Sequence, residues 1–185
     1  ASAVAATKLA AVPVKKGDVL KVGLVGCGGR GTGACRQALQ ADSGARLVAM
    51  ADMFSDRLEG SLERLQAIPA IADKIAVPQK NRFVGFEAFD ELLASGVDIV
   101  LLATPPHFRP AHLEKAVAAG VHVFAEKPVA VDGPGIRSVL ASCKLAKKKK
   151  LSVVSGLCLR YSYGFQELVR RLQDGAIGDL HGAGA

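Results

Sequence analysis

The chain has 185 residues, of which 50% are hydrophobic and 22% charged, and its formal net charge is +7. This composition is globular and excludes a disordered or collagen-like chain, while the length suits one ordinary domain with the start of a second. No apolar run reaches the ~20 residues of a membrane-spanning helix, so we expect a soluble protein without a membrane partner. Trp is absent and aromatic residues make up only 5%, so the core has to be aliphatic, which suits a helix-covered sheet.

From Leu20 onward, short aliphatic runs alternate with longer helical stretches, a pattern typical of βαβ units. Strands are expected at Leu20–Val25, Arg46–Ala51, Arg82–Gly85, Asp98–Ala103, Val121–Ala125 and Leu151–Ser155. Helices are expected at Thr32–Gln40, Ser55–Ile68, Glu87–Ala94, Pro110–Ala119, Pro134–Lys147 and Phe165–Asp174. The strand candidates are continuously apolar, as strands covered on both faces should be. The sequence therefore predicts an α/β protein with a doubly wound, mostly parallel sheet, the Rossmann fold, over residues 20–158.

Local signals mark where several of these helices begin and end. Ser55 suits an N-cap, and Pro134 suits the first turn of a helix. Gly96, Gly120 and Gly175 stand where helix C-termini are expected.

Both ends of the chain depart from this alternation. Residues 1–19 are interpreted as an Ala-rich arm or as the remnant of an export signal. Residues 159–185 are interpreted as a junction and the truncated start of a second α+β domain. Their last stretch, Asp179–Ala185, begins like a strand without a partner, and folded proteins avoid such edges. We therefore expect either a shortened chain or a partner at this end.

The four cysteines indicate neither a metal site nor a disulfide scaffold. Cys27, Cys35, Cys143 and Cys158 form no Cys-x-x-Cys pair and have no His at zinc spacing. We expect free buried or loop thiols and no bound metal.

A glycine-rich run follows the first strand and opens the first helix, which is the setting that a dinucleotide-binding loop requires. It consists of Gly26, Cys27, Gly28, Gly29, Arg30 and Gly31. Gly26 allows the tight turn, Gly28 lets the backbone approach a pyrophosphate, and Gly31 lets helix and strand pack closely. The alternative is a glycine-rich turn that binds no ligand.

Asp52 ends the second strand, close to the ~20 positions after Gly31 at which a ribose-binding acid is expected. Its carboxylate can accept both ribose hydroxyls and repels a 2′-phosphate, so the sequence favours NAD over NADP. Arg57 lies nearby and is the reservation, because an arginine can bind that phosphate. The alternative for Asp52 is a loop or helix-capping carboxylate.

Two polar loops follow the fourth and fifth strands, Thr104–His107 (Thr-Pro-Pro-His) and Glu126–Pro128 (Glu-Lys-Pro). In an open parallel sheet, ligands bind beyond the carboxyl ends of the strands, near the point where the strand order reverses. His107 and Lys127 are thus expected to point toward a nicotinamide, where Lys127 can donate a proton to a substrate oxygen. The alternatives are a lysine paired with Glu126 and a histidine with local hydrogen bonds.

A lysine cluster at Lys144 and 147–150 raises the possibility of nucleic-acid binding. No aromatic residue interleaves with it and no nucleic-acid motif accompanies it, so a solvated helix end is the preferred interpretation. The sequence therefore predicts no nucleic-acid partner.

From about Lys21 to Asp179 the chain resembles the N-terminal half of the Gfo/Idh/MocA oxidoreductases, the glucose–fructose oxidoreductase and inositol 2-dehydrogenase family. The resemblance is carried by the glycine loop, Ala51-Asp52, Ala103–Pro106, Ala119–Val123 and Glu126–Pro128. It implies hydride transfer between nicotinamide and a sugar, polyol or related carbonyl compound. It also implies a homo-oligomer for the full-length family form and, for the Ala-rich leader, export by the twin-arginine route as the alternative to a cytoplasmic location.

The resemblance also assigns site residues. Lys127 is the implied catalytic residue, and Arg160 and Tyr161 are implied substrate or junction residues. The cofactor is expected at the glycine loop, Asp52, Thr104, Pro105, His107, Glu126, Lys127 and Pro128. The chain departs from the family pattern in two respects. Arg109 stands where many members have His. We also expect the family's second domain, which usually supplies an acid–base His, to be missing from this chain beyond Ala185, and His181 matches no family motif that would replace that His. A non-catalytic nucleotide-binding or regulatory module is therefore the alternative function.

Overall fold

The computed structural model describes residues 18–179, 181 and 182, so nearly all of the predicted N-terminal arm lies outside the described residues. The chain divides into two compact units, the first ending at Ser155 and the second beginning at Gly156. Among the described residues, no helix is both long enough and apolar enough to cross a membrane.

The described part of the first unit is built on a six-stranded sheet. Its strands are β1 (Leu20–Val25), β2 (Ala45–Asp52), β3 (Arg82–Val84), β4 (Ile99–Leu102), β5 (His122–Ala125) and β6 (Val153–Ser155). Their order is β3-β2-β1-β4-β5-β6, and every neighbouring pair is parallel. This arrangement confirms the predicted doubly wound fold. The strand order reverses between β1 and β4, so the ligand crevice is expected at the carboxyl ends of these two strands.

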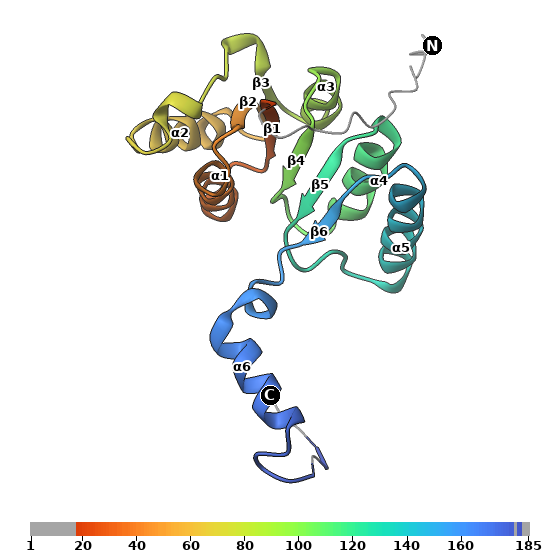
Figure 1. The fold of residues 1–185 in the computed structure, drawn as a ribbon. Coiled ribbons are helices and arrows are strands. Elements are labelled where there is room, and N and C mark those ends of the chain that lie inside the picture. Colours follow the sequence, from red (N-terminus) through yellow and green to blue (C-terminus); the bar gives the residue numbers. More distant parts are fainter. Residues whose placement is uncertain (1–17, 180, 183–185) are drawn as a thin grey trace. The chain divides into compact units, whose positions relative to one another are not determined.

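Helices cover both faces of this sheet (Figure 1). One face carries α1 (Gly29–Ala41) and α2 (Ser55–Gln66), and the other carries α3 (Ala88–Ala94), α4 (Arg109–Ala119) and α5 (Gly133–Lys148). Two short 3-10 turns, η1 (Ala72–Lys74) and η2 (Gln79–Asn81), lead into β3.

The two faces bury separate hydrophobic cores. Leu24 belongs to the core under α1 and α2, together with Leu39 and Leu58. The next residue, Val25, belongs to the core under α3, α4 and α5. Because successive strand residues point to opposite faces, both faces of β1 need apolar side chains. This explains the unbroken apolar runs in the sequence.

Helix boundaries follow the predicted signals with one exception. Gly96, Gly120 and Gly175 all have φ of +82° at helix C-terminal ends, and Pro134 lies in the first turn of α5. The prediction that Ser55 is an N-cap is wrong, because Ser55 is the first helical residue of α2 and caps nothing.

The second unit contains η3 (Cys158–Tyr161) and α6 (Tyr163–Gln173). Of the predicted final strand, the described residues Asp179, His181 and Gly182 lie in no strand. The boundary proposed at residues 158 and 159 stays a prediction.

Candidate functional site

The glycine loop crosses from β1 to α1 and lies directly against the end of β4. A Cβ atom at Gly26, whose φ is +90°, would lie 2.7 Å from the backbone nitrogen of Thr104. A Cβ at Gly31 would lie 1.8 Å from the carbonyl oxygen of Gly26, which no structure tolerates. A Cβ at Gly28 would meet nothing within 4 Å. Two of the glycines therefore serve close packing, and Gly28 leaves its side of the backbone open to a ligand.

The N-terminus of α1 has the properties of an anion site. Gly28 is the N-cap and offers no side chain to the first amides of the helix. Helix N-termini carry unpaired N–H groups and a partial positive charge, which together favour phosphate. This is the position at which the sequence predicts the pyrophosphate.

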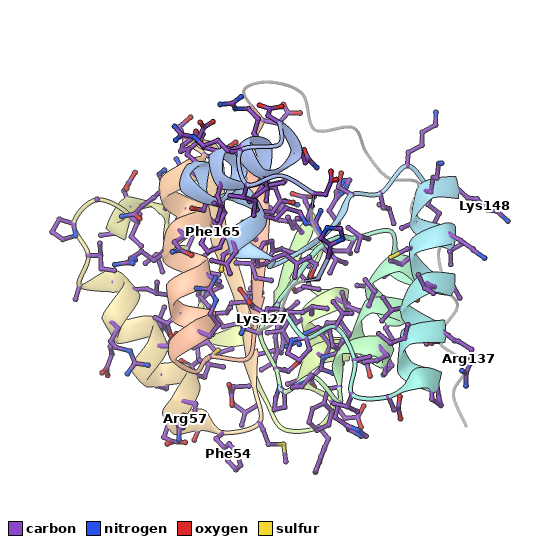
Figure 2. All side chains as sticks on the ribbon, turned by 90° about the horizontal axis from the view of Figure 1, so that it is seen from below. Phe54, Arg57, Lys127, Arg137, Lys148 and Phe165 are labelled. Atoms are coloured by element: carbon purple, nitrogen blue, oxygen red, sulfur yellow. The ribbon has the colours of Figure 1, made fainter. Side chains whose placement is uncertain are left out.

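Asp52 connects the end of β2 to the glycine loop. Its Oδ2 accepts a hydrogen bond from the backbone N–H of Cys27 at 2.6 Å, and its Oδ1 accepts one from the N–H of Phe54 at 3.0 Å. The second bond organises the start of α2, a task that the sequence had suggested for Ser55. Each carboxylate oxygen has two lone pairs, so these bonds leave acceptor capacity for other donors. Arg57, in the first turn of α2, is exposed, and Figure 2 shows it well apart from Lys127.

An apolar cavity of about 250 Å³ opens beside Asp52 at the ends of β1, β2 and β4. Its walls include Phe86, Phe89 and Phe108, which come from the starts of α3 and α4 and the loop before α3. A cavity with aromatic walls and a few polar groups suits a flat ring. The cavity is not predictable from the sequence alone, where its only signal is aromatic residues shortly after two strand ends.

His112 forms the inner wall of this cavity. Its ring stacks on Phe89 with a centroid separation of 4.2 Å and faces Phe108 at 6.0 Å. Its Nδ1 lies 3.5 Å from Thr104 Oγ1. Burial, helped by the positive charge of Lys115, lowers the pKa of His112 to about 4, so the imidazole is neutral at pH 7 and suits an uncharged ring.

The two polar loops are held together by Arg109. This side chain is only 2% exposed and donates hydrogen bonds to the carbonyl oxygens of Thr104 and Pro128. Arg109 thus ties the loop after β4 to the loop after β5.

Lys127 is exposed at the edge of the sheet and has no hydrogen-bond or ion-pair partner within the part of the chain that the structure describes. Its neighbour Glu126 is buried and forms an ion pair with Arg30, Nε to Oε1, at 2.6 Å. The alternative of a lysine paired with Glu126 is therefore wrong, and the Lys127 ammonium is available to a ligand.

Three further predicted site residues are His107, Arg160 and Tyr161. His107 is exposed and contacts the ring of Phe108 edge-on at a centroid separation of 5.4 Å, so its described contact is local. Arg160 and Tyr161 are exposed on η3 of the second unit, and their contact with cofactor or substrate stays a prediction. No group of three metal-binding side chains occurs in the described residues.

A family model and several known proteins match most of this chain. A family model described as the Gfo/Idh/MocA oxidoreductase family, NAD-binding Rossmann fold, matches residues 20–156. An inositol 2-dehydrogenase of Klebsiella pneumoniae is 30% identical over 162 residues, covering 86% of this chain and 43% of the relative. An inositol 2-dehydrogenase of Saccharopolyspora erythraea is 30% identical over 159 residues, covering 86% and 42%.

Solved structures show the same fold at lower identity. A 3-ketoreductase from Actinomadura kijaniata in complex with NADP has a TM-score of 0.67 at 24% identity, covering 88% of this chain and 46% of that chain. A myo-inositol 2-dehydrogenase from Lactobacillus plantarum has a TM-score of 0.67 at 21% identity, covering 88% and 43%. The chain thus spans less than half the length of these relatives.

Proposed function

Because this chain belongs to the Gfo/Idh/MocA oxidoreductase family, we propose that its first unit binds NAD(H) at the carboxyl edge of the sheet. We further propose that the protein transfers hydride between nicotinamide and a sugar, polyol or related carbonyl compound. The similarity to inositol 2-dehydrogenases supports this substrate class. A homo-oligomer, a cytoplasmic location and the twin-arginine alternative stay predictions.

The residues present fit a dinucleotide along one continuous path. The cavity beside His112 suits the adenine ring, and Asp52 suits the adenosine ribose hydroxyls. The open backbone at Gly28 and the N-terminus of α1 suit the diphosphate. Thr104, Pro105, His107, Lys127 and Pro128 are then left for the nicotinamide end. The observation that carries the proposal is the hydrogen bond from the Cys27 N–H to the Asp52 carboxylate. This bond holds the carboxylate proposed for the ribose next to the backbone proposed for the diphosphate.

In the proposed reaction the nicotinamide, when bound, supplies the carbon that gives or takes the hydride. Lys127 acts on the substrate oxygen. In the reductive direction its ammonium donates a proton to the carbonyl oxygen as that oxygen gains negative charge, and in the oxidative direction its neutral amine takes the hydroxyl proton. The free ammonium at the sheet edge supports this role.

Asp52 also supports NAD over NADP, since its negative charge repels a 2′-phosphate. The 3-ketoreductase neighbour contains NADP, so similarity alone leaves the choice open. Arg57 is the residue on this chain that can favour NADP, because it is exposed in the first turn of α2.

Fluorescence titration of the chain with NADH and with NADPH tests the proposal directly, because the absence of Trp leaves the nicotinamide emission clear. We expect tighter NADH binding, and we expect Asp52→Ala to weaken it about tenfold through lost charge-assisted hydrogen bonds. Asp56→Ala, which removes an exposed carboxylate of α2, is the matched control and should bind NADH like the parent. Tighter NADPH binding that is lost in Arg57→Ala would overturn the NAD preference, and failure to bind either dinucleotide would overturn the proposal.

A further inference from the structure

The ion pair between Arg30 and Glu126 connects parts of the chain that lie 96 positions apart. Arg30 is in the first turn of α1, within the glycine loop. Glu126 immediately precedes Lys127. The Glu126 side chain is almost fully enclosed, with an exposure of 7%, while the Arg30 side chain is 51% exposed. Breaking this pair should cost more than breaking a surface ion pair, because loss of Arg30 leaves the desolvated negative charge of Glu126 without its partner.

A second guanidinium acts on the same carboxylate. Burial lowers the pKa of Arg109, and the negative charge of Glu126 opposes that shift. The Nε of Arg109 is buried and has no hydrogen-bond partner in the described residues, so nearby negative charge matters to this side chain. Glu126 therefore pairs with a cation from α1 and attracts a second cation from α4 electrostatically.

These contacts close a triangle of loops. The glycine loop packs on the loop after β4 through Gly26 and Gly31. Arg109 ties the loop after β4 to Pro128, and the Arg30–Glu126 pair ties the loop after β5 back to the glycine loop. With three sides fixed, the backbone on either side of Lys127 has little freedom to move relative to the start of α1.

We infer that Arg30 and Glu126 are positioning residues that hold the Lys127 loop in one frame with the glycine loop. The inference rests on the proposed function, in which the glycine loop holds the diphosphate of NADH and Lys127 lies at its nicotinamide end. A contribution to folding stability does not by itself explain why the chain has this pair, since replacing a buried ion pair by apolar residues is often neutral or stabilising. We assign the pair a positioning role instead, because it links the backbone proposed to bind the cofactor to the loop that carries the Lys127 ammonium.

The test measures how strongly NADH protects Lys127 from acetylation by acetic anhydride, read by mass spectrometry of the 185-residue chain. Each variant is assayed without NADH and at a saturating NADH concentration taken from its own titration, so that a change in affinity does not enter. Arg30→Gln breaks the pair while leaving Glu126 and Arg109 in place. Arg30→Lys keeps the charge without the planar geometry. Glu59→Gln is the control, because it breaks the 2.9 Å pair between Glu59 of α2 and Arg82 of β3, and three strands separate β3 from β5, which Lys127 follows.

In the parent and in Glu59→Gln we expect NADH to slow acetylation of Lys127 by about tenfold, and in Arg30→Gln by less than about twofold, with Arg30→Lys in between. Glu126→Gln, provided that the variant folds, should show the same loss of Lys127 protection as Arg30→Gln. Parent-like protection in Arg30→Gln would overturn the inference, as would an equal loss in Glu59→Gln. A parent chain that binds NADH but gains no protection at Lys127 would instead overturn the proposed placement of Lys127, and the inference with it.

Discussion

Arg109 occupies a position where the family pattern has a different residue, and its role in this chain is structural. Many members of the family carry His at this position, and a histidine there can contact a ligand. Arg109 is 2% exposed and donates its hydrogen bonds to two loop carbonyls. The charge of Arg109 therefore serves to hold the two loops together, whereas the proposed function assigns ligand contact to the exposed Lys127.

His112 shows what burial does to a titratable group beside a ligand cavity. Its pKa is lowered to about 4 from 6.5, so the folded chain binds a proton less readily than the unfolded chain does. The stability that this neutral ring contributes is complete above about pH 6.5 and is lost as the pH falls toward 4. Between pH 7 and pH 5 we expect a loss of about 1 kcal/mol from this group, discounted for solvent screening.

Urea unfolding at pH 7 and pH 5 checks this expectation in the parent and in His112→Asn, which keeps a polar group near Thr104 but does not titrate. The variant should lose less stability than the parent over this interval, whatever its stability at pH 7. Equal losses in the two proteins would show that another group carries the pH dependence.

At the scale of elements, Lys149 explains part of the lysine cluster. Its Nζ donates hydrogen bonds to the carbonyl oxygens of Val117 at 3.0 Å and Ala118 at 2.7 Å, which are the last turn of α4. Carbonyls at a helix C-terminus lack intrahelical donors and carry partial negative charge. This lysine therefore holds the end of α5 against the end of α4, a structural task that needs no nucleic acid.

We expect Lys149→Met to lower the free energy of unfolding by about 1 kcal/mol, the usual contribution of charge-assisted hydrogen bonds that are partly solvated. Lys148→Met is the matched control, because Lys148 is exposed on the same turn (Figure 2) and surface substitutions change stability by less than about 0.5 kcal/mol. Urea denaturation of both variants measures the difference, and equal stability would contradict the capping role.

The elements that the sequence predicted correctly are those encoded by local pattern. β1 has the predicted bounds because an unbroken apolar run precedes a glycine turn, and Asp52 follows at the spacing that one βαβ unit fixes. The Arg30–Glu126 pair could not be predicted, since nothing local relates residues 96 positions apart. Arg109 was equally hidden, because a charged residue is normally expected at the surface. α1 begins three residues before the prediction because glycines, which disfavour helix interiors, here form its first turn.

The whole first unit is joined at the point where the strand order reverses. The β3-β2-β1 half and the β4-β5-β6 half meet where the glycine loop packs on Ala103 and Thr104. Fold and cofactor binding therefore depend on neighbouring glycines in different ways. The fold requires glycine at position 31, because the Cβ of any other residue there would collide with the backbone of Gly26. Gly28 has an extended conformation that any residue adopts and space around it, so it is needed only where a ligand approaches.

Thermal and urea unfolding with and without NADH separate these two roles. Gly31→Ala should lose about 2 kcal/mol or more of unfolding free energy, because the added methyl forces the two backbones apart. Gly28→Ser should stay within about 0.5 kcal/mol of the parent, since serine is a good N-cap residue.

The second measurement adds NADH at a hundredfold above its Kd. The parent should then gain about 2.7 kcal/mol of unfolding free energy, whereas Gly28→Ser should gain little, because its side chain would stand where the diphosphate is proposed to approach. A parent-like gain in Gly28→Ser would place the diphosphate elsewhere, and an unchanged Gly31→Ala would show that the loop can open without cost to the fold.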